Sequence, residues 1–381
     1  MGKWQTFEEA LCARFLERRS VIHGMLVGLV ARQHVLLIGP PGAAKSEMAK
    51  AVCGAVGGRF FRTTLTPTST PDELLGPVSA KRLIEEDVVA RHLEGTLATA
   101  DVAAVDEIWK CNAATLNSLL SVVNEREVSD GGRMVAVPLR TLVGTSNELP
   151  QDDSLTALWD RFSLRYRVDY IREPGAFLSL LSMPADGARA STIQGPTLDE
   201  VSAATTMLPG IAWDGVRDTL MRLWTTARQT WRVSVSDRRW QWCLRLCQAN
   251  ALLAGRAAVE PVDLLILADA LWEEPDQRLT IRQGLLDIVD PVLREAEELV
   301  DAAEEQCQKV SVATGEPKDV LVTISEAAKK IKRACSRLEE LRDMTRGKGR
   351  DTADIDEMLA RVQTMNRSIH KQLTSRYMGG E

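Results

Sequence analysis

The sequence lacks the features that would place the protein in a membrane or an oxidising compartment. Its 381 residues contain no apolar run approaching the roughly 20 residues that a transmembrane helix needs. The first 20 residues include acidic side chains and lack the apolar core of a signal peptide. The seven cysteines are odd in number and form no Cys-x-x-Cys pair, which favours free thiols over disulfides or a structural metal. These absences predict a cytoplasmic protein.

An excess of positive charge is absent as well. The chain has 53 acidic and 47 basic side chains, which gives a net charge of −6. Nucleic-acid-binding proteins usually carry a basic surface, so nucleic acid is not the expected partner. Hydrophobic residues make up 45% and charged residues 26%, values typical of globular proteins, and the length allows two or three domains.

The most informative motif present is GPPGAAKS, which follows the apolar run HVLLI at residues 34–38. A buried strand entering a glycine-containing turn that ends in Lys-Ser is typical of a phosphate-binding loop. Lys45 is expected to reach the β- and γ-phosphates of ATP, and the Ser46 hydroxyl to bind Mg²⁺. Ala44 replaces the usual glycine, and a chance turn is the alternative interpretation. The predicted nucleotide-binding residues here are Gly39, Pro40, Pro41, Gly42, Ala43, Ala44, Lys45, Ser46 and Glu47.

Polar residues end two further apolar segments. Residues 102–105 read as a buried strand followed by Asp106 and Glu107. Such an Asp can hold the water shell of Mg²⁺, and the adjacent Glu can polarise a water for attack on the γ-phosphate; a helix N-cap is the alternative. The strand at residues 139–144 leads into GTSNELP, so Asn147 is expected at the carboxyl edge of the sheet, where its amide could contact the γ-phosphate or the water.

Arginines in two later motifs are candidates for contacts with the transferred phosphate. Arg161 in LWDRF precedes the strand at residues 164–170 and could project into the site of a neighbouring subunit; a salt bridge with Asp160 is the alternative. Arg238 in VSDRRW opens a helix and could contact the γ-phosphate, although simple solvation would also explain it. The sequence does not separate Arg238 from the adjacent Arg239.

Alternating apolar strands and helices predict a parallel sheet covered on both faces. Two segments interrupt the alternation, a long insert at residues 76–99 and a hairpin at residues 127–137 around Asp-Gly-Gly. After residue 174 only helices are expected. The last hundred residues carry three apolar seams at helical spacing, broken at residues 315–317 and 347–349, which predict an antiparallel helical bundle. The first seam is Val289, Val292, Ala296, Leu299 and Ala303, and the second is Ile324, Ala327, Ile331, Ala334, Leu338 and Leu341. The five expected strands cover residues 34–38, 59–64, 102–105, 139–144 and 164–170.

The order and spacing of these motifs resemble the AAA+ ATPases. Within them, the chain resembles the MoxR family and its RavA-like group over about residues 20–275. The stretches that carry the resemblance are GPPGAAKS, STPDELLGPVS, VDEIWKCNAATLNSLLSVVNERE, GTSNELP, LWDRF, VSDRRW and AGRAAVEPVDLLILADALW. The resemblance implies an α/β core with a five-stranded parallel sheet (residues 1–172), an all-α lid (173–284) and a C-terminal triple-helical region (285–381). It also implies a hexameric ring with sites at subunit boundaries and a partner that carries a von Willebrand factor A domain.

The resemblance also assigns roles to single residues. It implies ATP and Mg²⁺ as cofactors, with the metal held by Ser46 directly and by Asp106 through water. ATP is expected between the core and lid of one subunit. The implied site residues are Asp106 and Glu107 as metal-binding and catalytic acids, Asn147 as first sensor, Arg161 as finger, Arg238 as second sensor, and Val21 and Ile22 near adenine.

The motifs and the resemblance together predict an ATPase that hydrolyses ATP in a ring to remodel, activate or mature a protein partner. A nucleic-acid-stimulated motor and a nucleotide-gated scaffold with little turnover are the alternatives. The RavA-like group carries a small β-rich domain between its C-terminal helices, which docks onto a partner enzyme. Only a few residues, 311–318, connect the first two helices here, so that particular partner is not implied.

Overall fold

The structure is a computed structural model, and it divides the chain into two compact units, residues 1–281 and 282–381. No helix in the described part of the chain is both long and apolar enough to cross a bilayer. The described residues are 2–150, 155–183, 193–313, 317–347 and 352–378.

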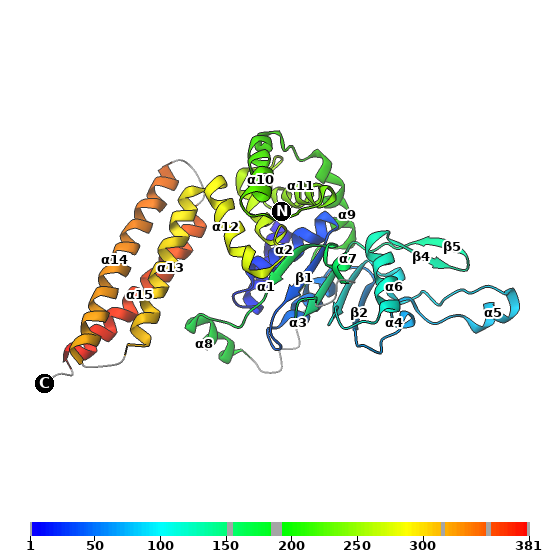
Figure 1. The fold of residues 1–381 in the computed structure, drawn as a ribbon, viewed down its shortest axis with the longest axis horizontal. Coiled ribbons are helices and arrows are strands. Elements are labelled where there is room, and N and C mark those ends of the chain that lie inside the picture. Colours follow the sequence, from blue (N-terminus) through cyan, green and yellow to red (C-terminus); the bar gives the residue numbers. More distant parts are fainter. Residues whose placement is uncertain (1, 151–154, 184–192, 314–316, 348–351, 379–381) are drawn as a thin grey trace. The chain divides into compact units, whose positions relative to one another are not determined.

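A five-stranded sheet forms the centre of the first unit, and every neighbouring pair in it is parallel. The predicted parallel sheet is therefore confirmed. β1 and β3 are buried at every position, as their unbroken apolar sequences require. In spatial order the strands are β2 (Phe60–Thr64), β3 (Val102–Asp106), β6 (Thr141–Ser146), β1 (His34–Ile38) and β7 (Phe162–Arg167) (Figure 1).

The helices α2 (Arg19–Ala31) and α3 (Lys45–Ala55) pack against the sheet and against each other. α2 is apolar around most of its circumference, and its last eight residues are all buried, so it is a core helix rather than a surface one. α2 is separated from the preceding helix α1 (Gly2–Arg14) by a short break, where Glu17 adopts a left-handed backbone with φ of 58°.

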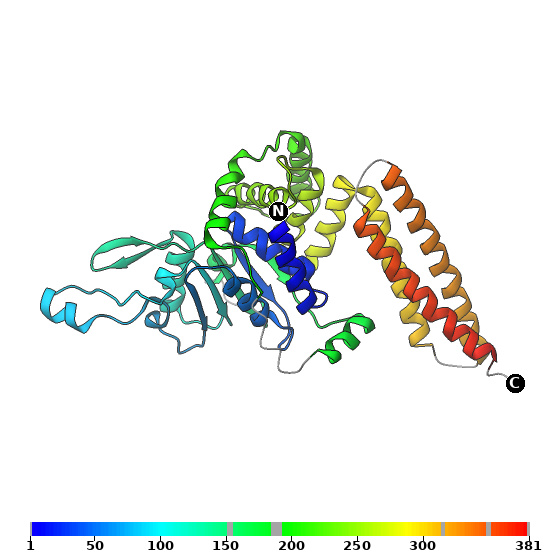
Figure 2. The same ribbon diagram turned by 180° about the vertical axis from the view of Figure 1, so that it is seen from behind.

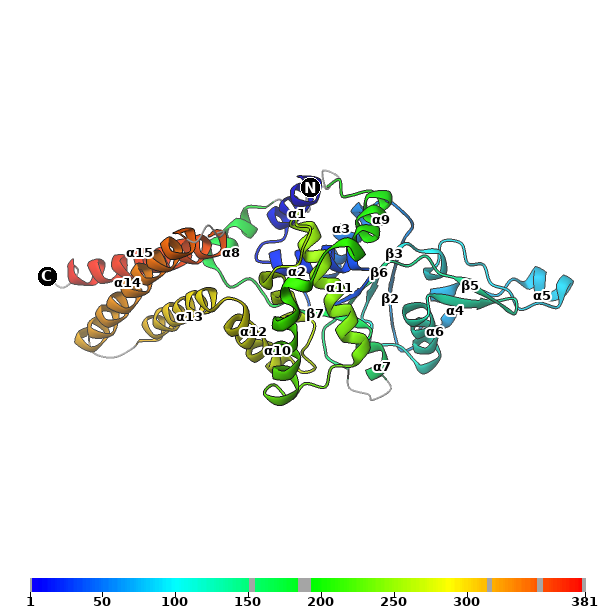
Figure 3. The ribbon, with the colours of Figure 1, turned by 90° about the horizontal axis from the view of Figure 1, so that it is seen from above.

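The predicted insert and hairpin lie beside each other and extend from the side of the sheet where α6 packs (Figures 1 and 3). Gly131 and Gly132 form the two-residue turn with φ of 58° and 74°, as a tight hairpin requires. The backbone N–H of Gly131 donates to the Val89 carbonyl at 3.0 Å, and that of Arg91 donates to Asp130 at 2.6 Å. The elements are α4 (Pro71–Leu75), α5 (Ala80–Glu86), η1 (Leu97–Thr99), α6 (Ala113–Asn124), β4 (Glu127–Asp130) and β5 (Arg133–Ala136).

Among the described residues after β7, every named element is a helix, as expected. Pro261–Asp269 forms a 3₁₀ helix, η5. α8 is unusual because none of its residues is buried, although it contains Phe and three Leu. The elements are α7 (Thr156–Trp159) before β7, and after it α8 (Pro174–Ser182), α9 (Leu198–Met207), η3 (Leu208–Gly210), η4 (Asp214–Val216), α10 (Arg217–Gln229), α11 (Asp237–Leu253), η5 and α12 (Pro275–Val289).

A buried arginine ties the end of these helices to the sheet. Arg165 on β7 has no exposed surface and donates to the main-chain carbonyls of Phe162 and Trp272. Its guanidinium lies 4.3 Å from the centre of the Trp159 ring, and the Trp272 indole N–H donates back to the Arg165 carbonyl at 3.2 Å. These contacts satisfy a charge that burial would otherwise penalise.

The second unit contains three long helices, α13 (Pro291–Ser311), α14 (Pro317–Gly347) and α15 (Ala353–Met378), and each contacts the other two (Figure 2). The predicted bundle is thus confirmed. The seam predicted for α14 is buried throughout. In α13 the predicted Ala296 and Ala303 are buried, whereas the predicted Val292 and Leu299 are only half-buried. Leu293 and Val300 are buried instead, because α13 packs on two partners and buries a shifted stripe. Gly315, Glu316, Lys348 and Gly349, named as helix breaks, lie outside the described residues.

The close approach of Gly39, which follows β1, to the backbone after β7 can be tested directly. A Cβ atom on Gly39 would lie 2.0 Å from the Val168 carbonyl oxygen, which belongs to the backbone and cannot rotate away. Gly39→Ala should therefore destabilise the protein by about 2 kcal/mol and lower its melting temperature. Gly175→Ala is the matched control, because nothing lies within 4 Å of its added Cβ. Equal melting temperatures for the two variants in calorimetry would contradict the close approach.

Candidate active site

The loop after β1 has the shape of an anion cradle. Gly42 and Ala44 adopt positive φ values of 80° and 63°, which turn the backbone toward the N-terminus of α3. The Gly39 N–H donates to the Ser146 carbonyl at 3.1 Å, which fixes the start of the loop against β6. A backbone that turns in this way into a helix N-terminus presents N–H groups to phosphate.

Lys45 is a buried ammonium, and its hydrogen-bond partners among the described residues are all neutral. It is 6% exposed and donates to the carbonyls of Gly39 at 2.6 Å and Pro40 at 2.8 Å, and to Asn147 Oδ1 at 2.9 Å. Burial lowers the pKa of Lys45, while the nearby carboxylates of Glu107 and Asp106 oppose that effect. A phosphate group would supply the anionic partner that this ammonium lacks.

Asp106 ends β3 and is held in place from two sides. Its Oδ1 accepts a hydrogen bond from the Thr145 hydroxyl at 2.8 Å, and its Oδ2 lies 3.3 Å from the Arg62 guanidinium. Thr145 belongs to β6, the neighbouring strand, so sheet pairing brings the two together. The carboxylate is buried but remains at the sheet edge that Lys45 occupies.

Glu107 and Asn147 form the centre of the site. The Asn147 amide donates to Glu107 Oε1 at 2.6 Å while its oxygen accepts from Lys45, so one side chain joins lysine and glutamate. Lys110 Nζ lies 3.2 Å from the other Glu107 oxygen. Glu107 has a φ of 53°, and such left-handed non-glycine residues are often found at functional sites.

The structure places Arg161 at the opposite edge of the sheet. Arg161 immediately precedes β7, whose first residue pairs with His34 at the beginning of β1, whereas the phosphate loop follows the end of that strand. The five residues of β1 span about 16 Å. Arg161 therefore does not join Lys45 within one chain, and its guanidinium instead lies 5.9 Å from the Trp242 ring centre and 3.6 Å from Asp160.

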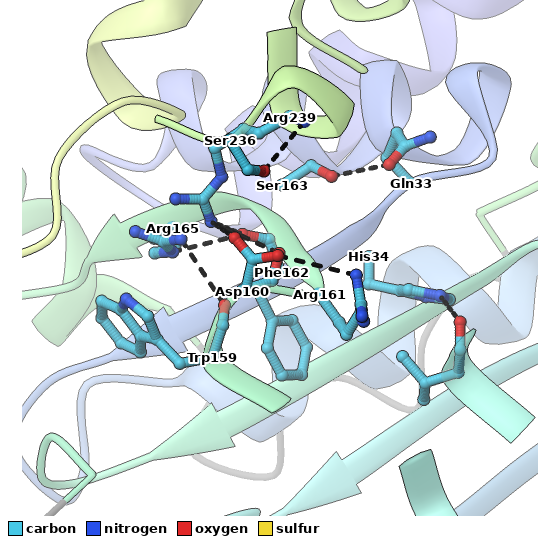
Figure 4. A network of polar contacts seen from close by, with 11 residues as sticks. Gln33, His34, Trp159, Asp160, Arg161, Phe162, Ser163, Arg165, Ser236 and Arg239 are labelled. Carbon is cyan, nitrogen blue, oxygen red and sulfur yellow. Dashed lines mark hydrogen bonds and ion pairs between the residues drawn. The ribbon is translucent and has the colours of Figure 1, made fainter. Parts of the chain in front are cut away.

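The two candidate second sensors have different surroundings. Arg239 is 2% exposed; it donates to the carbonyls of Asp160 and Phe162, and its guanidinium also lies 3.7 Å from the Asp160 carboxylate (Figure 4). Arg238 is exposed and lines the same cleft as Arg161. The geometry thus leaves Arg238 accessible at the amino edge and makes Arg239 a structural residue of the α11–β7 contact.

Three other predicted residues share no side-chain hydrogen bond or ion pair with Lys45, Asp106, Glu107 or Asn147 in the described part of the chain. Val21 and Ile22 are buried in α2, with 4% and 0% exposed. Glu47 is exposed and lies 3.5 Å from Arg14. A role near adenine or nucleotide stays a prediction for all three.

The donor set fits a magnesium–nucleotide complex better than a free metal ion. No group of three or more His, Cys, Asp or Glu side chains in the described ranges could hold a metal. Mg²⁺ is commonly held by substrate phosphates with one or two protein oxygens, and Ser46 and Asp106 would provide these. A cavity of about 360 Å³ adjoins the loop and is lined by Gly39, Pro40, Asn147, Trp272 and Pro275, among others.

Sequence reasoning missed the residues that position the acids. Thr145 lies within the GTSNELP motif, but only the strand pairing shows that its hydroxyl bonds to Asp106. Lys110 follows Glu107 by three residues and offered a local signal, since it lies one turn away. Arg62 is 44 residues from Asp106 and gave no signal in the sequence.

Comparison with known proteins places this site in a family. Residues 3–199 match a family model described as the MoxR domain in MoxR-vWA-beta-propeller ternary systems, and residues 216–285 match an AAA lid domain. An uncharacterized protein of Methanocaldococcus jannaschii is 33% identical over 304 residues, 80% of this chain and 78% of that protein.

Two other matches agree with this placement. The chaperone MoxR1 of Mycobacterium tuberculosis is 33% identical over 155 residues, 40% of each chain. The crystal structure of a candidate ATPase from Cytophaga hutchinsonii has a TM-score of 0.61 and 17% identity; it covers 75% of this chain and 93% of that one, and shows the shared fold. The family models cover most of the first unit, so the chain belongs to the MoxR family of AAA+ ATPases.

Proposed function

We propose that this protein hydrolyses ATP in a Mg²⁺-dependent reaction and uses it to remodel or activate a protein partner. One observation carries the proposal: Asn147 bonds both Lys45 and Glu107 at the carboxyl edge of the sheet. A phosphate-binding lysine and a general base are thereby held on either side of one amide. The γ-phosphate and its attacking water would have to meet at this point.

Each residue has a distinct role in this proposal. Lys45 and the loop N–H groups bind the triphosphate, and Ser46 and Asp106 hold the metal, which neutralises charge on the phosphate oxygens when bound. Glu107 accepts a proton from the attacking water, and Asn147 orients that water or the γ-phosphate. Val21 and Ile22 would lie near adenine, within a core of residues 1–172 followed by a lid of residues 173–284.

The positions of Arg161 and Arg238 favour a ring of subunits. Both line a cleft at the amino edge of the sheet, away from the phosphate loop of their own chain. An arginine can stabilise the transition state only within reach of the transferred phosphate. In a ring of copies, which the family resemblance puts at six, the cleft of one subunit would face the phosphate loop of the next.

The partner is proposed to be a protein with a von Willebrand factor A domain, because the matched family model describes MoxR-vWA systems. The insert and hairpin are the proposed contact surface. Ile84 is 83% exposed, Val89 62% and Met134 57%, and the hydrogen bond from the Gly131 N–H to the Val89 carbonyl joins the two segments. Clustered exposed apolar residues often mark protein-binding sites.

Glu107→Gln tests the chemical step. The amide cannot accept the proton, so ATP turnover should fall roughly 100-fold or more while nucleotide affinity stays within about twofold. Steady-state turnover and fluorescent-nucleotide titration measure the two quantities. Glu357→Gln, at an exposed carboxylate on α15, is the matched control. Undiminished turnover in Glu107→Gln would exclude the mechanism.

Mixing variants tests the shared site. Arg161→Ala should reduce turnover about 1,000-fold, because the finger charge is lost. Adding Lys45→Ala chains, which keep Arg161 but cannot hold ATP, should restore turnover in mixed rings. Lys45→Ala/Arg161→Ala chains serve as the control and should restore nothing. Equal activity in the two mixtures would argue for a finger that acts within its own chain.

A capture experiment tests the contact surface. Glu107→Gln chains should retain the partner in ATP, and adding Ile84→Asp should reduce its recovery several-fold by placing a charge in an apolar contact. Val312→Asp is the control, since Val312 is 73% exposed in the second unit. Quantitative mass spectrometry of the eluates compares partner recovery by Glu107→Gln alone, with Ile84→Asp added, and with Val312→Asp added. Undiminished recovery with Ile84→Asp would move the partner site elsewhere.

A further inference from the structure

Four arginines line a single cleft at the amino edge of the sheet. The cleft has a volume of about 550 Å³, and its lining in the described part of the chain includes Arg32, Arg126, Arg161 and Arg238 and a single carboxylate, Glu125. Arg32 follows α2, and Arg126 lies between α6 and β4, so neither belongs to the motifs that contain Arg161 and Arg238. Two of the four arginines therefore have no role in the site described above.

The four guanidinium groups of the cleft outnumber the carboxylates near them among the described residues, which are Glu125 in the lining and Asp160, 3.6 Å from Arg161. Burial lowers the pKa of Arg126 to about 10, and repulsion from Arg32 adds to that effect. Burial and the neighbouring Arg238 also lower the pKa of Arg161. The Nε atoms of Arg32 and Arg161 are buried, and no described residue accepts a hydrogen bond from either. Like charges that share a partly desolvated cleft disfavour one another unless an anion joins them.

The cleft is also held in a defined shape. Arg126 donates to the Arg32 carbonyl at 2.7 Å, which ties the start of the hairpin to the end of α2. His34 beneath them accepts the Leu142 N–H on Nδ1, and burial lowers the pKa of His34 to about 3, so the ring stays neutral. The arginines thus form a preorganised set of hydrogen-bond donors in a cleft that is also lined by the neutral His34 ring.

We propose that Arg32 and Arg126 join Arg161 and Arg238 in a binding site for a triphosphate group, which in the assembly belongs to the ATP bound by the adjacent copy of this chain. This inference rests on the proposed function and adds two binding residues to it. Guanidinium groups match phosphate oxygens in pairs, and a triphosphate concentrates several negative charges in a volume that this cleft can hold. A single carboxylate in the lining offers no comparable counter-charge.

Binding of inorganic tripolyphosphate to Lys45→Ala chains tests the site, because that background disables the phosphate loop. Calorimetry at low salt should show saturable binding. Arg32→Gln should weaken it about fivefold and Arg32→Gln/Arg126→Gln more than tenfold, since each removes a charged donor. Arg222→Gln, an exposed arginine on α10 outside the cleft, should change it less than twofold. Arg32→Gln leaves intact the carbonyl that Arg126 bonds, which limits the risk of misfolding. Absent binding, or equal affinity in all variants, would overturn the proposal.

A mixing assay identifies the source of the triphosphate. Arg32→Gln/Arg126→Gln chains keep the phosphate loop, and Lys45→Ala chains keep the cleft. If the ligand is the neighbour's ATP, the mixture should turn over ATP at least fivefold faster than the sum of the two alone. Merely additive rates alongside tripolyphosphate binding would mean that free polyphosphate is the ligand, and would overturn the assignment to the neighbour.

The proposed hydrolysis can survive the failure of this inference. If Arg32→Gln/Arg126→Gln turns over ATP at the wild-type rate while Glu107→Gln does not, the cleft inference fails and the proposed function stands. If Glu107→Gln retains full turnover, the proposed function itself fails.

Discussion

The parallel register of the central sheet is the constraint on which the rest of the site depends. Because β3, β6 and β1 run in one direction and lie side by side, the residues that follow them gather at one edge. Lys45, Glu107 and Asn147 are far apart in sequence and come within hydrogen-bonding distance for this reason. The same register sends Arg161, which precedes β7, to the other edge. One sheet thus presents a phosphate loop on one side and an arginine cleft on the other.

At the carboxyl edge, the chain satisfies its own charges through Asn147. The amide accepts from Lys45 and donates to Glu107, so it mediates between an ammonium and a carboxylate that both lie close to the same point. A γ-phosphate would compete for Lys45 and for the amide. Glu107 would then lose its partner as the phosphate arrives, which links substrate binding to release of the base. The left-handed backbone at Glu107 fixes where that carboxylate can go.

Much of this arrangement followed from the sequence because it depends on local signals. A continuous apolar run predicts a buried strand, and the polar residues that follow it must emerge at the carboxyl edge of the sheet. The sequence alone therefore predicts that Lys45, Asp106 and Asn147 lie at this edge. Contacts between distant segments gave no such signal. Thr145 on Asp106 depends on strand order, and the shifted seam of α13 depends on which helices surround it. Arg32 and Arg126 follow the ends of two helices, where an arginine is ordinarily explained by the helix dipole.

The hairpin and the arginine cleft are parts of one structure, because Arg126 belongs to both. Its side chain donates to the Arg32 carbonyl at the end of α2, and its own carbonyl accepts the Val137 N–H at 2.7 Å, which closes the base of the hairpin. The insert is bonded to the turn of the same hairpin through Val89 and Gly131. A continuous path of hydrogen-bonded backbone therefore runs from the exposed apolar residues of the insert to the cleft. The surface proposed to meet a protein and the arginines proposed to meet a triphosphate are thus attached to the two ends of one hairpin, its turn and its base.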